Sequence, residues 1–249
     1  MFEQQDSVLL VVPVWNDSAR FGRYAPFLAK ALSASGLPVR WVVSDDGSSE
    51  EEQAKLRRLV EDLRAIYPRV ECLFASERSR KGGAVYRAWN SYPEADWVGF
   101  VDADGAIDPD TVLRLIRGAI EQGKDGGCVG VRRDSEEAPV KRPAGRLLSS
   151  GLFAFLVRRL TGLHFSDTQC GIKILPGRGY RAVSHKLRES GFIFDVELLL
   201  ALRCYGCRIE ELAIPWREMP RGKMRPLLDA WRMAAGLWRI RKRLKAGAY

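Results

Sequence analysis

WVGFVDADGAIDP, residues 97–109, is the stretch of sequence that decides the fold. Its first five residues are apolar or small, which is typical of a strand buried on both faces, and such strands belong to parallel sheets covered by helices on each side. Two carboxylates, Asp102 and Asp104, follow this strand directly. Because ligands of these sheets collect at the carboxyl ends of the strands, the same stretch predicts a binding site.

The alternation of strand and helix continues through the first half of the chain. Short β-branched runs at residues 8–14, 39–43 and 70–74 are separated by segments with helical periodicity, such as 19–35 and 50–67. This βαβ order predicts an α/β fold with a mostly parallel, doubly wound central sheet.

The second half of the chain has a different pattern. We expect helices at residues 146–161 and 195–205 and a strand at 208–215. No internal repeat or long linker divides the chain. We therefore expect one domain over residues 1–225, followed by a basic amphipathic helix within 226–249.

Charge is unevenly distributed along the 249 residues, whose formal net charge is +9. Residues 1–129 carry 16 basic and 20 acidic side chains, residues 130–190 carry 12 and 5, and residues 217–249 carry 10 and 2. The acidic first half argues against a groove for nucleic acid. The two basic segments favour local anionic partners such as phosphates or a membrane surface, with a solvated charged face as the alternative.

The compartment is indicated by the cysteines and by the start of the chain. Five scattered cysteines suggest no disulfide framework, and MFEQQDSVLL lacks the basic flank and apolar stretch of a signal peptide. The longest uncharged run, residues 147–157, is too short to span a bilayer. We expect a cytoplasmic protein.

Carboxylates follow three of the expected strands. Asp102 and Asp104, one residue apart, can bind a hard divalent cation such as Mg²⁺ or Mn²⁺ and leave positions for diphosphate oxygens. For each site an ordinary explanation stays open. Asp102 and Asp104 can belong to a turn, Asp45 and Asp46 to a turn before a helix N-cap, and Asp17 to a helix cap.

The motifs, taken together in their order and spacing, resemble the family 2 glycosyltransferases. They are PVWND (13–17), VVSDDGSSE (42–50), KGGAV (81–85), FVDADGAIDP (100–109), SDTQCGIK (166–173) and GFIFDVELLLALRCYGCRIEELAIPW (191–216). The last two are similar to the polyprenyl-phosphate branch, most of all to dolichyl-phosphate β-glucosyltransferases. The resemblance covers residues 8–245 and implies a GT-A fold. It also implies an inverting transfer of a hexose from a nucleotide-diphosphate sugar to a polyprenyl or dolichyl phosphate.

The resemblance also implies a donor site. Its residues are Pro13, Trp15, Asp17, Asp45, Asp46, Lys81, Gly82, Asp102, Ala103 and Asp104. Within it Asp45 resembles the carboxylate that reads the base, and Asp102 with Asp104 resembles the metal and diphosphate pair. For Lys81 an ordinary loop at a helix start is the alternative. Ala106 stands where mannose synthases commonly place Gln, which favours UDP-glucose over GDP-mannose as the donor.

Arg132, Arg146 and Ser150 match the spacing of acceptor-phosphate contacts in the mannose synthases. Arg146 and Ser150 would share one face of a helix, and guanidinium groups suit phosphate. A phosphate monoester is largely dianionic at neutral pH, so it needs no strong general base.

Further carboxylates complete the candidate catalytic set with Asp104. Asp167, Asp195 and Glu197 are candidates for binding sugar hydroxyls or orienting the acceptor. Asp167 can instead cap a turn, and Asp195 and Glu197 can cap the helix that begins nearby.

The terminal helix presents a stripe of apolar residues beside a basic flank. The stripe comprises Leu227, Leu228, Trp231, Ala234, Ala235 and Trp238. Such a helix suits an anionic membrane interface, and core packing is the alternative. We expect a peripheral protein on the cytosolic face of a membrane, with residues 147–157 as a second contact.

Three alternative functions stay open. The first is mannosyl transfer from GDP-mannose to a polyprenyl phosphate, and the second is a family 2 transferase acting on a soluble or polysaccharide hydroxyl. The third is a basic nucleic-acid-binding protein, in which the carboxylates at the strand ends would have no role. We therefore expect no nucleic-acid partner.

Overall fold

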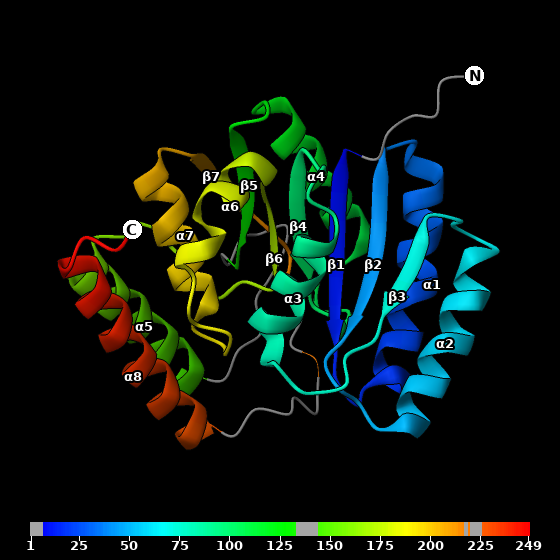
Figure 1. The fold of residues 1–249 in the computed structure, drawn as a ribbon, viewed down its shortest axis with the longest axis horizontal. Helices are drawn as coiled ribbons and strands as arrows, with labels where there is room; N and C mark the ends of the chain where they lie inside the picture. Colours follow the sequence, from blue (N-terminus) through cyan, green and yellow to red (C-terminus); the bar gives the residue numbers. More distant parts are fainter. Residues whose placement is uncertain (1–6, 133–143, 217–218, 220–225) are drawn as a thin grey trace.

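The computed structural model contains one seven-stranded sheet (Figure 1). It describes residues 7–132, 144–216, 219 and 226–249. The strands are β1 (Val8–Val14), β2 (Val39–Asp45), β3 (Val70–Leu73), β4 (Trp97–Val101), β5 (Gly126–Val131), β6 (Ile172–Pro176) and β7 (Arg208–Ala213). Their order is β3-β2-β1-β4-β6-β5-β7. Only β6 runs against its neighbours, β4 and β5, so the sheet is mostly parallel, as the sequence predicts.

Helices cover both faces of this sheet. They are α1 (Ser18–Ser35), α2 (Glu50–Arg64), α3 (Arg80–Ser91), α4 (Pro109–Glu121), α5 (Ala144–Thr161), α6 (Gly177–Val183), α7 (Phe194–Tyr205) and α8 (Pro226–Lys245), with a short 3₁₀ turn, η1 (Ser184–Lys186). One core forms between the sheet and α1, α2 and α4. A second core joins the other face to α3, α6 and α7, and side chains of α5 and α8 also pack into it.

The apolar runs of the first half form the strands that the sequence predicts. β1 and β4 have the predicted bounds, and β2 extends two residues further, to Asp45. Every residue of β4 is buried, since α3 and α4 pack on opposite faces of the sheet. The double burial explains why these strands are continuously apolar rather than alternating.

Strand β6 is absent from the sequence-based prediction. All five of its residues are buried, and the second one is Lys173, whose side chain is completely inaccessible to solvent. A charged residue within a short run and Pro176 at its end both lower the strand signal. The strand forms because Lys173 has a buried ion-pair partner, which sequence periodicity does not reveal.

The carboxyl ends of β2, β1 and β4 lie side by side at one edge of the sheet, at the bottom of the view in Figure 1. Val14 is in register with Asp45, and β1 pairs with β4 on its other side. Segments after three different strands, which are far apart in the sequence, therefore meet at this edge. The topology thus assembles the carboxylates in one place.

Helices α5 and α8 pack against each other outside α7 (Figure 1). On α8 the buried side chains are mainly Leu237 and Ile240, whereas Trp231 and Trp238 are 70% and 62% exposed. The described part of the predicted apolar stripe is therefore not core packing. No helix among the described residues is long and apolar enough to cross a bilayer.

Charged groups anchor α8 to the body of the protein. Buried Glu189 accepts hydrogen bonds from Arg239 Nε (2.9 Å) and Nη2 (2.7 Å) and from Arg243 Nη2 (3.2 Å). Burial alone would raise the pKa of Glu189, but the hydrogen bonds from the two arginines outweigh it and lower this pKa. The last turns of α8 are thus held by an ionised carboxylate.

We predict that Glu189→Gln lowers the free energy of unfolding by about 1–3 kcal/mol, because charge-assisted hydrogen bonds are lost. The pKa of Glu189 lies below its ordinary value of 4.5, so its contribution is present above that pH and is lost as the pH falls through the folded-state value. Urea unfolding at pH 7 and below pH 4 measures both effects. Glu210→Gln, at an exposed position of β7, is the control and should change stability by less than about 0.5 kcal/mol.

Candidate functional site

The carboxylate of Asp45 ends β2 and is completely buried. Its Oδ2 accepts hydrogen bonds from Ser48 N (3.2 Å) and Gln53 Nε2 (2.9 Å). Its Oδ1 accepts none from the described residues. A buried carboxylate oxygen without a donor is costly, so this atom suits an N–H group of a ligand. The hydrogen bond from Ser48 N to Asp45 also forms the turn that the sequence offers as the ordinary explanation for Asp45.

The loop after β1 is fixed to the loop after β2. Asn16 N donates to Ser48 Oγ (2.8 Å), and Ser49 N donates to Asn16 Oδ1 (2.8 Å). Asn16 has a φ of 47°, in the left-handed region that Asn tolerates better than most residues. Beside it the Arg78 guanidinium carbon lies 3.3 Å from the centre of the Trp15 ring. The indole therefore has a fixed place next to the β2 end.

Asp46 connects the same edge to the start of α3. Its Oδ1 accepts hydrogen bonds from Ser79 N (2.7 Å) and Ser79 Oγ (2.9 Å). The next residue, Gly47, has a φ of 69°, and a Cβ there would lie 2.7 Å from the backbone of Glu77. Asp46 thus has a structural role that the sequence does not indicate.

Asp102 lies between backbone and side-chain partners at the end of β4. Its N–H donates to Gly171 O (2.9 Å), and its Oδ1 lies 2.6 Å from Lys81 Nζ. Burial alone would lower the pKa of Lys81, but the charges of Asp102 and then Asp195 outweigh it and raise this pKa. Lys81 is therefore an ammonium ion paired with Asp102.

Asp104 occupies the turn two residues later. Its Oδ1 accepts a hydrogen bond from Ala106 N (3.0 Å). Burial, and then the negative charge of Asp102, raise the pKa of Asp104. Two carboxylates held this close repel each other, and a cation between them would relieve the repulsion. The pair expected from the sequence is thus brought together.

Behind this pair lies a second, fully buried ion pair. Lys173 Nζ is 2.6 Å from Asp195 Oδ1 and donates to Cys170 O (2.9 Å). Burial raises the pKa of Asp195 and outweighs the opposing charges of Lys173 and Lys81. Asp195 therefore lies in the first turn of α7 as part of an internal charge pair, within the electrostatic reach of Lys81 and Asp102.

Asp167 and Arg132 form a two-pronged ion pair after β5. Arg132 Nε lies 2.6 Å from Asp167 Oδ2, and Nη2 lies 2.9 Å from Oδ1. Burial alone would raise the pKa of Asp167, but Arg132 outweighs it and lowers this pKa. Asp167 Oδ1 also accepts a hydrogen bond from Gln169 N (3.1 Å), so the expected turn contact exists beside the ion pair.

Glu197 makes a different set of contacts from Asp195, although only two residues separate them. Its Oε2 accepts hydrogen bonds from Arg188 N (2.8 Å) and Glu189 N (2.6 Å). Its Oε1 pairs with Arg243 Nη2 (2.6 Å) and accepts a bond from the Tyr249 hydroxyl (2.7 Å). The structure thus places Glu197 among the groups that anchor α8.

The remaining predicted residues are placed as follows. Pro13 lies within β1, in register with Ser44 of β2. Asp17 pairs with Arg20 (3.3 Å), and its side chain makes no capping hydrogen bond to α1, so the cap expected as an alternative does not form. Ala103 is partly buried against the core.

Gly82 and the acceptor residues differ in how completely they are described. Gly82 N donates to Ser190 O (2.8 Å), and a Cβ at Gly82 would lie 2.6 Å from Phe194. Arg146 and Ser150 lie on α5, but their side chains fall outside the described residues.

Several residues that support the site were not predicted from the sequence. Arg87 of α3 donates through Nη2 to Asp45 O (2.5 Å), and Gly171 has no space for a side chain because a Cβ there would overlap the Asp102 carboxylate. Lys173, which pairs with Asp195, is the third supporting residue that was not predicted. For Gly171 the sequence offers one signal, namely a glycine directly before the strand β6.

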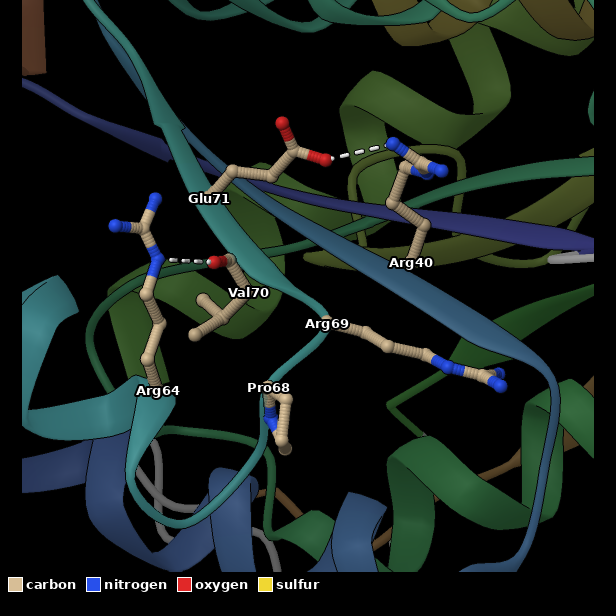
Figure 2. A pocket seen from close by; sticks show the side chains of 6 residues that line it. All are labelled: Arg40, Arg64, Pro68, Arg69, Val70 and Glu71. Atoms are coloured by element: carbon tan, nitrogen blue, oxygen red, sulfur yellow. Dashed lines mark hydrogen bonds and ion pairs between the residues drawn. The ribbon is translucent and has the colours of Figure 1, made fainter.

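The pocket in Figure 2 lies elsewhere. It has a volume of about 290 Å³ and includes Arg40, Arg64, Arg69 and Glu71. Arg40 is near the start of β2, and Val70 begins β3. This pocket therefore lies at the amino-terminal ends of these strands, whereas Asp45 lies at the carboxyl end of β2. Arg40 pairs with Glu71 (2.8 Å), and Arg64 donates to the carbonyl of Val70 (3.1 Å).

The chain is similar to known proteins over most of its length. A family model described as glycosyl transferase family 2 matches residues 10–186. A dolichyl-phosphate beta-glucosyltransferase of Drosophila melanogaster is 31% identical over 250 residues, which cover 96% of this chain and 76% of that protein. The protein of the same name from Saccharomyces cerevisiae is 29% identical over 256 residues, covering 96% and 75%.

A solved structure has the same fold. It is glucosyl-3-phosphoglycerate synthase from Mycobacterium tuberculosis, crystallised with Mn²⁺, UDP-glucose and phosphoglyceric acid. It superposes with a TM-score of 0.65 at 15% sequence identity, covering 95% of this chain and 80% of that one. The likeness confirms the single-domain GT-A fold implied by the motifs.

We predict that Lys173→Met lowers the free energy of unfolding by about 3–5 kcal/mol at pH 8, because Asp195 is left as an unpaired buried charge. The loss should be smaller near pH 4, because the buried carboxyl binds a proton at low pH; its destabilising effect develops as the pH rises from the ordinary pKa of 3.8 through the raised folded-state pKa. Urea unfolding measures both. Adding Asp195→Asn should restore part of the loss, and a double variant as unstable as the sum of the two single variants would contradict the pairing.

Proposed function

This chain belongs to glycosyl transferase family 2, and we propose that it transfers glucose from UDP-glucose to a polyprenyl phosphate. The observation that carries the proposal is the row of carboxylates Asp45, Asp102 and Asp104 at neighbouring strand ends. One buried oxygen of this row accepts no hydrogen bond from the described residues, and two of its members repel each other. A nucleotide base could donate a hydrogen bond to Asp45, and a cation bound with the diphosphate would relieve the repulsion between Asp102 and Asp104.

The donor is proposed to bind along the ends of β2, β1 and β4. Asp45 Oδ1 would accept the imino N–H of uracil, and the Trp15 ring beside it offers an apolar surface to the nucleoside. Glucose is favoured because the similar proteins from Drosophila melanogaster and Saccharomyces cerevisiae are named as glucosyltransferases.

Asp102 and Asp104 fit a divalent cation that prefers oxygen ligands, such as Mg²⁺ or Mn²⁺. Among the described residues no group of three or more His, Cys, Asp or Glu side chains gathers, so two carboxylates leave several positions for diphosphate oxygens and water. When bound, such an ion would stabilise the negative charge of the departing UDP.

The acceptor is proposed to act as its own nucleophile. A phosphate oxygen would form a bond to C1 of glucose while the bond from C1 to the β-phosphate oxygen breaks, which inverts the configuration at C1. Asp167 holds two nitrogens of Arg132, and we propose that the other N–H groups of this guanidinium bind the acceptor phosphate. Arg146 and Ser150 are proposed to complete that site.

A lipid acceptor implies a membrane-facing surface, which we place on α5 and α8. Leu152 and Phe155 of α5 and Trp231 and Trp238 of α8 are more than 60% exposed. Removing a polyprenyl chain from a bilayer costs about 0.8 kcal/mol per CH₂, so the enzyme is expected to come to the lipid. We propose peripheral attachment to the cytosolic face.

The test of the proposed function is an assay of purified protein with UDP-glucose, Mn²⁺ and polyprenyl phosphate in vesicles. Asp104→Asn should lower turnover by about two orders of magnitude or more, because it removes a charge that binds the cation. Asp110→Asn, at the start of α4, is the control and should retain turnover. Circular dichroism checks that both variants fold.

The same preparation distinguishes the alternatives. Calorimetry should show that the protein binds UDP more tightly than GDP when Mn²⁺ is present. Tight GDP and negligible UDP binding would favour mannosyl transfer, and turnover with a soluble hydroxyl acceptor in place of the lipid would contradict the polyprenyl phosphate.

A flotation experiment tests the membrane surface. The wild-type protein should float with vesicles that contain anionic lipid, and the double variant Trp231→Ser/Trp238→Ser should float several-fold less, because two exposed indoles no longer enter the interface. Tyr205→Ser removes an exposed aromatic ring from the end of α7 and is the control. Equal flotation of the double variant and the wild type would move the contact to residues 147–157.

A further inference from the structure

We propose that Lys81 is a built-in counter-ion for Asp102, which competes with a divalent cation in the donor-free protein and so makes cation binding depend on the nucleotide. The inference rests on the proposed function, since it assumes that Asp102 and Asp104 bind the cation. It assigns to Lys81 a positioning role that acts before any sugar is transferred.

The geometry places an ammonium ion where the cation's charge would be needed. Lys81 Nζ lies 2.6 Å from Asp102 Oδ1, and the two side chains are 19% and 35% exposed. The same nitrogen is 4.8 Å from the centre of the Phe100 ring and 5.9 Å from that of Phe194. Lys81 is thus held against Asp102 by a direct ion pair and by two aromatic faces.

The backbone of Lys81 cannot follow its side chain away from this position. The next residue, Gly82, donates its N–H to Ser190 O (2.8 Å), and Phe194 fills the space beside its Cα. Arg80, the residue before, already has a φ of 68°, in the left-handed region. A change of partner by Lys81 must therefore occur by rotation of its unbranched side chain.

The balance of charges explains why a cation alone would bind weakly. The charges acting on Lys81 are those of three carboxylates, Asp102, Asp104 and Asp195. Together with Lys81 itself and with Lys173, which pairs with Asp195, this local group has three negative and two positive charges. A divalent cation would reverse the sign of this total and would lie beside the Lys81 ammonium, which repels it. Asp195 offers Lys81 no full alternative partner, since Lys173 lies 2.6 Å from it.

A diphosphate changes this balance. It brings negative charge that Lys81 and the cation can share, so Lys81 can rotate from Asp102 to a phosphate oxygen without losing an anionic partner. The protein is therefore expected to bind the cation together with the nucleotide rather than before it.

The test compares Mn²⁺ binding by wild type and by Lys81→Met, which keeps an unbranched chain but removes the charge. Without nucleotide, the variant should bind Mn²⁺ on the order of tenfold more tightly, because a neighbouring positive charge is gone. With UDP present, the order should reverse, because the variant lacks a phosphate contact. Calorimetry or the resonance signal of unbound Mn²⁺ measures both states, and a merely structural defect would not tighten ion binding.

Two further variants serve as controls. Lys124→Met removes an ammonium from another ion pair, 2.9 Å from Asp96, and should leave Mn²⁺ binding unchanged. The double variant Lys81→Met/Asp102→Asn should not show the tighter Mn²⁺ binding of Lys81→Met, because the carboxylate that pairs with Lys81 is also removed. Lys81→Gln repeats the test if the methionine variant does not fold.

The outcomes separate this inference from the proposed function. If the wild type binds Mn²⁺ with UDP but Lys81→Met binds Mn²⁺ alone no more tightly than the wild type, the competition is disproved and the metal site stands. If the wild type binds no Mn²⁺ even with UDP, the proposed metal site is wrong and the inference is overturned with it.

Discussion

The buried ion pair between Lys173 and Asp195 is the interaction on which the rest of the site depends. Lys173 is the second residue of β6, and Asp195 lies in the first turn of α7, so the pair fixes the helix to the sheet. The same ammonium binds Cys170 O and thereby fixes the segment that enters β6. Both ends of the pair are buried, and neither has access to water as a substitute partner.

Both halves of the site depend on this pair. The carbonyl of Gly171, next to Cys170, accepts a hydrogen bond from the N–H of Asp102. A few residues earlier, Asp167 forms the ion pair with Arg132. On the other side, Phe194 at the start of α7 fills the space beside Gly82. The segments proposed to bind donor and acceptor are therefore positioned by the same charge pair.

The sequence predicts the parts of the fold that are built from local patterns, and it misses those built from long-range pairs. The strands ending at Asp45 and Val101 are predicted because double burial makes them continuously apolar. Strand β6 is missed because Lys173 resembles a surface residue until its partner is known. Likewise the contact of Glu197 with Tyr249 joins residues 52 positions apart, which no periodicity reveals.

The reversed direction of β6 gives this edge of the sheet a chemical property that parallel strands do not supply. Where parallel strands end, the following helices begin, and their first turns present N–H groups that attract anions. Strand β6 begins at this edge instead, since Ile172 pairs with Val101 at the end of β4. The segment leading into it contributes carbonyl oxygens, and those of Cys170 and Gly171 bind an ammonium and an N–H. One antiparallel strand thus brings carbonyl oxygens to an edge where the helix starts attract anions, and these oxygens hold Lys173 and the backbone of Asp102 in place.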